Sequence, residues 1–327
     1  MQRDISTDVA KGVAICLVVL GHAIRGIQSA DIVPPGVWAL ADARIYAFHM
    51  PLFFALSGWF FLRSIQKRGV GSFVTGRLER ILYPMVIWTY VFLAFKYLAN
   101  QAANQPIGLE DVFVLPIPGV LHFWFLWALL LMSLAFYPLR YAPARATGAV
   151  LVLAGVAVVA LQFLPLTPAS DRWVGPAIRH APYFLLGIAL GHYGLGRLRQ
   201  PGLGLLAAGI FVGLLYLWPE VAGAWYRLAV VLALVLSVLV AFLTFERHLP
   251  QGLRRLLAVL GVASMAIYVM HTIFSAALRE GLLVAGVAQP GLHLVLGTFV
   301  GIIGPMIALW VFRRFGLTRI LGLEARG

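Results

Sequence analysis

Ten apolar segments, separated by short polar loops, follow one another along the chain. Each segment is close to the ~20 residues that a helix rising ~1.5 Å per residue needs to cross ~30 Å of hydrocarbon. The pattern therefore predicts an all-α, polytopic membrane protein with about ten transmembrane helices. The segments cover residues 9–26, 44–62, 81–99, 121–138, 147–164, 177–194, 202–218, 224–244, 256–278 and 292–312.

Composition supports this prediction. Of the 327 residues, 61% are apolar and 11% are charged, against roughly 25% charged residues in soluble domains. A water-soluble globule cannot bury that much apolar surface. We expect one membrane domain over residues 1–327, with a short basic tail over 313–327 and no second, soluble domain.

The net charge of +13 lies on one side of the predicted membrane. When alternate loops are assigned to one side, that side holds 18 of the 25 positive residues but only five of the 12 acidic residues. By the positive-inside rule this side is cytoplasmic, which places both termini in the cytoplasm. No folded basic domain remains for nucleic acid, so we expect no nucleic-acid partner.

Sequence motifs exclude several kinds of soluble-enzyme chemistry. One cysteine, Cys16, excludes a disulfide framework and a Cys-based zinc site, because both need at least two thiols. A Walker loop, an HExxH pair, a CxxC pair and a GxSxG elbow are all missing from the sequence, and we expect no metal. The candidates are ionisable residues inside the apolar segments, since these are costly there and usually face a cavity or a partner.

Lys11 and His22 lie in the first apolar segment. At ~100° per residue, the eleven steps between them make three turns plus ~20°, so both lie on one stripe of a helix, roughly 16 Å apart along its axis. Lys11 is then near the cytoplasmic end and His22 beyond the midplane. Plainer roles stay open: Lys11 as an anchor at the membrane interface, and His22 as a histidine packed against a neighbouring helix.

Two motifs show a family resemblance. The motifs are Lys11-Gly-x-x-Ile-x-Leu-Val-Val-x-Gly21-His22-Ala and Phe48-His49-Met-Pro-Leu-Phe-Phe-x-x-Ser57-Gly58. They resemble those of the acyltransferase 3 family of integral membrane O-acyltransferases, and most closely its fucose 4-O-acetylase-like branch. The later stretches His122-Phe-Trp124-Phe-Leu and Ser264-x-x-Ile-Tyr268-x-x-His271 also look like the family's, so the resemblance covers nearly the whole chain.

The resemblance implies ten spans, a cytoplasmic acyl-CoA donor and a glycan acceptor at the outer face. The family's basic residue, followed after ten positions by a histidine, maps onto Lys11 and His22. Its Arg-x-x-Arg maps onto Arg77 and Arg80. Many relatives carry an extra periplasmic hydrolase-like domain, and we expect no fused periplasmic domain here.

The chemistry of acyl transfer gives these residues roles. A thioester donor supplies an activated acyl group, so the enzyme chiefly needs a base, a positioned carbonyl and a clamp for the donor phosphates. His22 is the expected general base, because an unperturbed histidine pKa of ~6.5 lies near the operating pH. An acyl-histidine intermediate stays open. Lys11 and His49 complete the predicted catalytic set, with His49 either orienting His22, contacting the acceptor or serving as a structural histidine.

Arg77 and Arg80 are the predicted donor-binding residues. We expect them in a cytoplasmic loop or helix start, where guanidinium groups suit the phosphates of coenzyme A. Their i, i+3 spacing predicts one shared helical face. Topology signalling or the binding of anionic lipid is the alternative.

A weaker set of residues is predicted to bind the acceptor. Loop charges, interfacial tryptophans and buried polar packing explain the same residues without a function. The set is Asp42, Arg44, His122, Trp124, Tyr268 and His271.

The sequence therefore predicts an acyl-CoA-dependent O-acyltransferase of the bacterial inner-membrane type. It moves an acyl group, expected to be acetyl, to a hydroxyl of an extracytoplasmic or lipid-linked glycan. Acyl-CoA, this glycan and membrane lipids are its expected partners. A proton-coupled transporter of small solutes is the alternative, since a midplane histidine suits both. The sequence names neither the sugar nor the oligomeric state.

Overall fold

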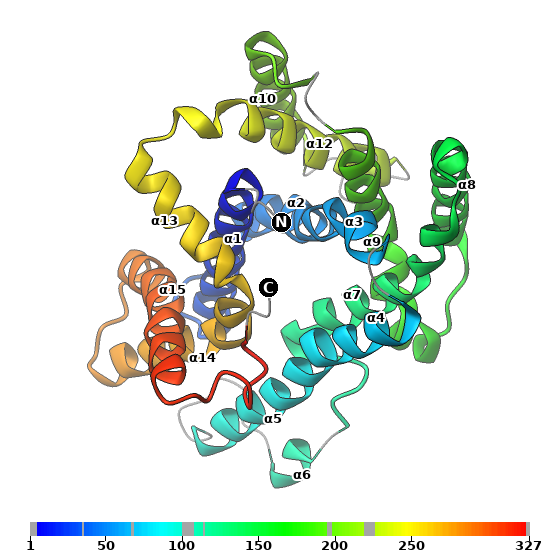
Figure 1. Cartoon of the computed structure of the whole chain (residues 1–327). Helices are drawn as coiled ribbons and strands as arrows, with labels where there is room; N and C mark the ends of the chain where they lie inside the picture. Colours follow the sequence, from blue (N-terminus) through cyan, green and yellow to red (C-terminus); the bar gives the residue numbers. More distant parts are fainter. Residues whose placement is uncertain are drawn as a thin grey trace. The chain divides into compact units, whose positions relative to one another are not determined.

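A computed structural model describes residues 5–34, 36–66, 69–99, 108–113, 115–194, 198–218 and 226–324. Within these ranges the chain forms helices joined by short turns, and no β-strand occurs among them (Figure 1). The prediction of an all-α membrane protein is confirmed. The last three residues of the predicted basic tail lie outside the described ranges.

Eight helical segments in the described part of the chain are long and apolar enough to cross a membrane. The two other predicted spans lie in α9 (Pro168–Tyr193) and α10 (Pro201–Tyr216), of which α9 carries several charges and α10 has only 16 residues. A total of ten transmembrane helices stays a prediction. The eight segments are Ile5–Ser29, Ala39–Gln66, Val70–Leu98, Leu121–Tyr141, Ala144–Phe163, Arg227–His248, Ser264–Val284 and Pro290–Arg314.

One predicted helix is interrupted. The sequence predicts a single helix over residues 256–278, but α13 (Gln251–Val262) ends before Ala263 and α14 (Ser264–Val284) begins after it. The prediction is wrong because α13 is an amphipathic helix that packs along α1 (Ile5–Ser29) as an element of its own. Apolar content alone does not separate such a helix from the span that follows it.

The helices form two compact units. Unit 1 comprises Met1–His49, Tyr83–Ile117 and Gln251–Gly327, and unit 2 comprises Met50–Leu82 and Pro118–Pro250. Helix α2 belongs to both, because the boundary between the units falls inside it.

Helix α1 is the centre of unit 1, since it contacts α13, α14 and α15, while α14 and α15 pack along each other (Figure 1). Two glycines allow the contact with α13. A Cβ atom on Gly12 would collide with the carbonyl of Leu257, and one on Gly261 with the carbonyl of Asp8. The two backbones therefore touch where the helices meet. Helix α15 covers Pro290–Arg314. The other elements of the unit are the first half of α2 (Ala39–Trp59), α5 (Tyr83–Leu98) and α6 (Leu109–Val112).

The chain after α15 is bonded to the start of α5. The Tyr83 hydroxyl donates to the carbonyl of Ile320 at 2.7 Å, and the Trp88 indole N–H donates to the carbonyl of Leu321 at 2.9 Å. Gly322 adopts a positive φ of 67° where this segment lies against Pro84. Unit 1 thus joins the C-terminal segment to a helix from the first third of the sequence.

Helix α9 is the centre of unit 2, because it contacts α3, α7, α8 and α12. Helix α10 packs along α12 at the edge of this group (Figure 1). The helices of unit 2, besides α9, α10 and the second half of α2, are α3 (Phe61–Gln66), α4 (Val70–Arg77), the π-helix η1 (Leu78–Leu82), α7 (Trp124–Ala135), α8 (Thr147–Ala160) and α12 (Arg227–Phe245). The short 3₁₀ turns are η2 (Leu121–Phe123), η3 (Tyr137–Tyr141), η4 (Ala144–Ala146), η5 (Leu161–Phe163) and η7 (Glu246–His248).

Small residues bring α9 against α2 in unit 2. A Cβ atom on Gly187 would collide with the carbonyl of Ala55, and one on Gly191 with the carbonyl of Trp59. The spacing Gly-x-x-x-Gly places both glycines on one face of α9. The two helices therefore pack backbone to backbone.

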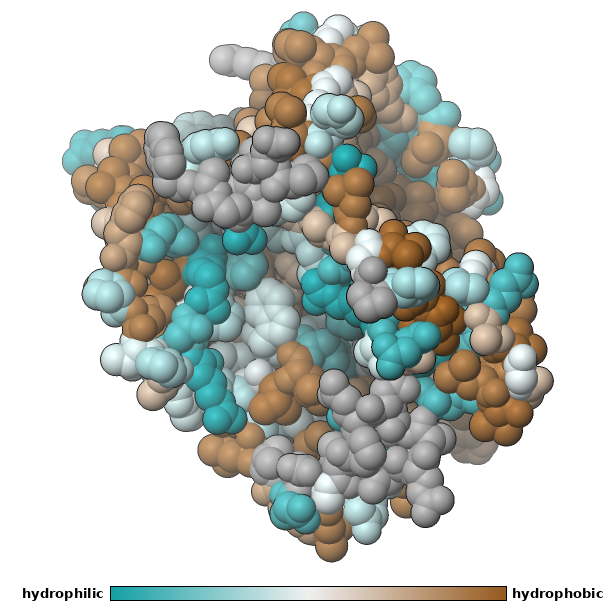
Figure 2. Space-filling model, turned by 180° about the vertical axis from the view of Figure 1, so that it is seen from behind, coloured by the Kyte–Doolittle hydropathy of each residue, from teal (hydrophilic) through white to brown (hydrophobic). Residues whose placement is uncertain are grey.

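Large apolar side chains cover much of the surface visible in Figure 2. Helix α8 carries several exposed apolar side chains, since Val152, Leu153 and Val156 are about two-thirds exposed at 65%, 68% and 65%. Such a surface is unfavourable in water and suits contact with lipid tails. It accords with a protein that crosses a membrane several times.

The α2–α9 contact predicts a clear stability effect. We expect Gly187→Ala to destabilise the protein by about 1–3 kcal/mol, because the added methyl group has no space beside Ala55. Thermal unfolding in detergent measures this as a lower Tm. Gly209→Ala in α10 is the control, since open space surrounds Gly209. Equal Tm values for both variants would contradict the proposed packing constraint.

Candidate active site

Helix α1 carries Lys11 and His22 on one uninterrupted helix from Ile5 to Ser29. Both side chains are half-buried. The Nδ1 atom of His22 lies 3.0 Å from the carbonyl oxygen of Val18, in the preceding turn. Because a carbonyl oxygen only accepts, Nδ1 donates in this contact, and the neutral ring keeps its lone pair at Nε2. His22 is therefore in the tautomer in which Nε2 accepts a proton.

Helix α14 brings a second histidine against His22. His271 is fully buried, and its ring centroid lies 4.8 Å from that of His22 in an edge-to-face arrangement. Its Nδ1 donates to the carbonyl of Tyr268 at 2.7 Å. The Tyr268 ring lies 6.2 Å from that of His271. Two residues from the weaker predicted set thus join the surroundings of His22.

Helix α2 places Tyr46 between His22 and His49. The Tyr46 ring centroid is 4.4 Å from that of His49 and 6.2 Å from that of His22, and its hydroxyl oxygen is 3.5 Å from Nδ1 of His22. His49 is fully buried and donates from Nδ1 to the carbonyl of Ile45 at 2.8 Å. We call His22, Tyr46, His49 and His271 the histidine cluster.

An ion pair lies beside the histidine cluster. Arg25 donates to both carboxylate oxygens of Asp42, at 2.9 and 3.1 Å, and its guanidinium carbon lies 3.1 Å from the centre of the Tyr46 ring. This arrangement combines a bidentate ion pair with a cation–π contact. It joins α1 to α2 and holds the Tyr46 ring. Arg44, predicted together with Asp42, also lies on α2, two residues further along.

Sequence reasoning missed Tyr46 and Arg25, although a signal for both exists. Asp42, Tyr46 and His49 are spaced by four and three residues, which places them on one face of a helix. Arg25 follows His22 by one turn. A search for polar residues on the same faces as the two motif histidines would have found both.

Gly21 explains how Tyr46 comes close to α1. A Cβ atom on Gly21 would lie 3.0 Å from the Tyr46 ring. The residue before His22 must therefore be small for the cluster to form as it does.

The two predicted donor-binding arginines lie in the first half of the helical segment Val70–Leu98, which agrees with the expected helix start and not with a loop. Arg77 ends α4, and Arg80 lies in the π-helix Leu78–Leu82 that leads into α5. The expected α-helical spacing of the pair is wrong, because a π turn is wider than an α turn. The Arg77 guanidinium lies 4.9 Å from the centre of the Phe73 ring, which helps to orient it.

The remaining predicted acceptor residues lie in unit 2. His122 is buried in a 3₁₀ turn, with its ring 4.0 Å from that of Phe123. Trp124 begins α7. Its ring centroid lies 5.1 Å from that of His180 in α9 and 6.2 Å from that of Phe54. The sequence paired Trp124 with His122, whereas the ring contacts of Trp124 include His180, a residue that the sequence analysis missed.

Acidic residues, histidines and cysteines do not gather in this part of the molecule into a metal-binding group. Among the described residues, no group of three or more is placed to hold a metal ion.

Comparison with known proteins decides the family. Residues 4–310 match the acyltransferase 3 profile, described as an acyltransferase domain. The chain belongs to the acyltransferase 3 family. The resemblance seen in the motifs is thereby confirmed, and the molecule is a multi-pass membrane protein of this family.

Three known proteins are similar to this chain. It is 32% identical to the nodulation protein NolL of Sinorhizobium fredii over 57% of this chain and 48% of that protein. It is 28% identical to NolL of Mesorhizobium japonicum over 57% of this chain and 47% of that protein. It is 26% identical to the inner membrane protein YcfT of Escherichia coli over 83% and 80%. The chain thus matches about half the length of the nodulation proteins, and no solved structure matches it.

The packing of Gly21 predicts a functional effect at a residue with no reactive group. We expect Gly21→Ala to reduce acyl transfer about two- to tenfold, because the Tyr46 ring beside His22 must shift by a few tenths of an ångström to admit the methyl group, and small misplacements near a catalytic group lower the rate. The measurement is acyl transfer per amount of folded enzyme. Gly281→Ala in α14, where space is open, is the control. Unchanged transfer in Gly21→Ala would show that the position of Tyr46 does not matter.

Proposed function

We propose that this enzyme moves an acyl group, acetyl being the expected one, from cytoplasmic acyl-CoA to a hydroxyl group of an extracytoplasmic or lipid-linked glycan. The observation that supports this most is the contact between Nδ1 of His22 and the carbonyl oxygen of Val18. With the Nδ1 proton donated to Val18, Nε2 is the atom left to remove a proton from the acceptor hydroxyl.

The reaction at His22 balances without a further reactant. Nε2 takes the hydroxyl proton while the hydroxyl oxygen attacks the thioester carbonyl. The C–S bond of the resulting tetrahedral intermediate then breaks, and the thiolate of coenzyme A leaves with the proton from the imidazolium. His271 and Tyr46 hold the His22 ring in one orientation during these steps. An ester of the acceptor and free coenzyme A are the products.

The histidine cluster also contains His49, which we assign to positioning. Its ring reaches His22 through Tyr46. Lys11 lies on the same helix as His22, toward the end that we propose to be cytoplasmic. A positive charge there favours the entry of an anionic donor.

Arg77 and Arg80 are proposed to bind the donor phosphates. Their planar guanidinium groups suit bidentate contacts with phosphate. The π turn between α4 and α5 supports a special role for this stretch, since such turns occur frequently at functional sites.

Replacement of His22 tests the proposed base. We expect His22→Ala to fold normally and to lose about 10²–10⁴-fold in transfer, the usual contribution of proton transfer by a positioned side chain. Release of coenzyme A in the presence of membrane glycans measures the rate. His192→Ala is a matched control, because His192 is exposed at the last turn of α9. Wild-type turnover in purified His22→Ala would remove His22 from the mechanism, and a wild type that never consumes acyl-CoA would favour a transporter.

A salt series tests the proposed donor clamp. We expect Arg77→Gln and Arg80→Gln each to weaken acetyl-CoA binding and to flatten its decline with rising salt, because phosphate contacts at a wet surface are screened over ~8 Å at physiological ionic strength. Calorimetry with acetyl-CoA and with coenzyme A measures both effects. Arg145→Gln is the control, since Arg145 is exposed and lies on the same predicted side of the membrane. Variants that bind acetyl-CoA like the wild type at every salt concentration would place the donor elsewhere.

A further inference from the structure

Helix α9 of unit 2 is unusually polar for a long helix in a membrane protein. Its 26 residues include Asp171, Arg172, Arg179 and His180, and it is not among the eight helical segments that are apolar enough to span a membrane. Polar side chains at membrane depth require a partner or a function. The proposed reaction at His22 uses none of these residues.

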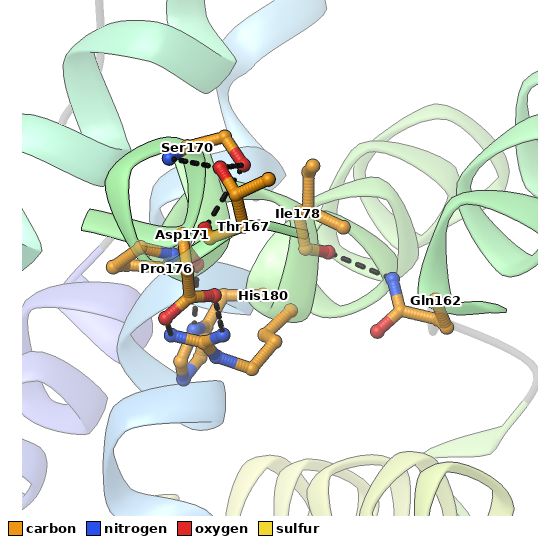
Figure 3. A network of polar contacts seen from close by, with 8 residues as sticks. Gln162, Thr167, Ser170, Asp171, Pro176, Ile178 and His180 are labelled. Atoms are coloured by element: carbon orange, nitrogen blue, oxygen red, sulfur yellow. Dashed lines mark hydrogen bonds and ion pairs between the residues drawn. The ribbon is translucent and has the colours of Figure 1, made fainter. Parts of the chain in front are cut away.

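His180 is held in a defined orientation. Its Nδ1 donates to the carbonyl of Pro176 at 2.8 Å, so the neutral ring keeps an acceptor lone pair at Nε2 (Figure 3). The ring is packed among aromatic side chains from three helices. The centroid distances are 4.8 Å to Phe54, 5.1 Å to Trp124 and 5.9 Å to Tyr183.

A side chain from the neighbouring helical segment stabilises α9 at this point. Pro182 has no N–H, so the carbonyl of Ile178, four residues earlier, loses its usual helical partner. The amide nitrogen of Gln162 donates to this carbonyl at 2.8 Å (Figure 3). The same nitrogen donates to the carbonyl of Val158 at 2.9 Å. Gln162 thus satisfies the helix where proline interrupts it, next to His180.

The burial of the aromatic residues is graded. Phe54 is fully buried and Tyr183 is buried, whereas Trp124 and His180 are half-buried. One residue before His180, Arg179 forms an exposed ion pair with Asp171. Apolar ring faces, an imidazole acceptor and a charged pair therefore occur together on one unit.

We propose that the half-buried Trp124 and His180, supported from behind by the buried Phe54 and Tyr183, form a binding subsite for a sugar ring of the acceptor glycan. The C–H groups of a pyranose carry a slight positive charge and favour the negative face of an aromatic ring. Nε2 of His180 accepts a hydrogen bond from a sugar hydroxyl. A lipid tail would use the ring faces but neither the histidine acceptor nor the ion pair, so the chemistry favours a sugar. This inference rests on the proposed function, because it assigns a position to the acceptor.

Saturation-transfer NMR with the full-length protein in nanodiscs tests the subsite directly. The probes are methyl pyranosides of fucose, glucose, galactose and N-acetylglucosamine, each titrated to give a Kd. His180→Phe retains the ring and removes the acceptor atom, and we expect a Kd about two- to tenfold weaker, which corresponds to one hydrogen bond. Trp124→Ala should weaken binding by about tenfold or more. His180→Gln, whose amide oxygen replaces Nε2, should bind better than His180→Phe.

Two controls separate this subsite from the proposed reaction. His192→Phe changes an exposed histidine at the other end of α9 and should bind the pyranosides like the wild type. His22→Ala should also retain pyranoside binding although transfer is lost. Two results would overturn the subsite and leave the role of His22 untouched. In the first, His180→Phe and Trp124→Ala both bind every probe like the wild type. In the second, the wild type binds none of the probes. Transfer that survives in His22→Ala would overturn the proposed base and not the subsite.

Discussion

Four histidines of this membrane protein donate the Nδ1 proton to a backbone carbonyl three or four residues earlier in their own helix. In hydrocarbon an unsatisfied polar group costs several kcal/mol, so a histidine on a membrane helix needs such a partner. The bond also decides the chemistry, because it leaves Nε2 as the only acceptor of the neutral ring. The proposed roles of His22 as a base and of His180 as an acceptor of a sugar hydroxyl both depend on this one interaction.

The glycines of the first motif have roles as specific as those of its polar residues. Gly12 admits the backbone of α13, and Gly21 admits the ring of Tyr46. Between Lys11 and His22, other helices therefore contact α1 closely at two points, Gly12 and Gly21. A helix of larger residues would carry the same Lys11 and His22, but without the neighbours that orient them.

Hydropathy predicts the all-α membrane architecture well, because lipid exposure demands long apolar helices wherever the chain crosses the bilayer. It fails at Ala263, where amphipathic α13 and apolar α14 follow each other without a polar loop. The motifs led to His22 and His49, but periodicity within one helix does not say which helices meet. The packing of His271 on His22, and of His180 on Trp124, joins residues far apart in the sequence and requires the folded chain.

The division into two units has a consequence for biosynthesis. Unit 2 is complete once residue 250 has been made, whereas unit 1 combines the start of the chain with its end. His22 obtains its partner His271 only when α14 has emerged, and Trp88 obtains its hydrogen-bond acceptor 233 residues after its own synthesis. Domains generally fold in the order in which they leave the ribosome. The proposed catalytic histidine, although among the first residues translated, therefore acquires its surroundings last, so a nascent chain that stalls before α14 contains no assembled histidine cluster.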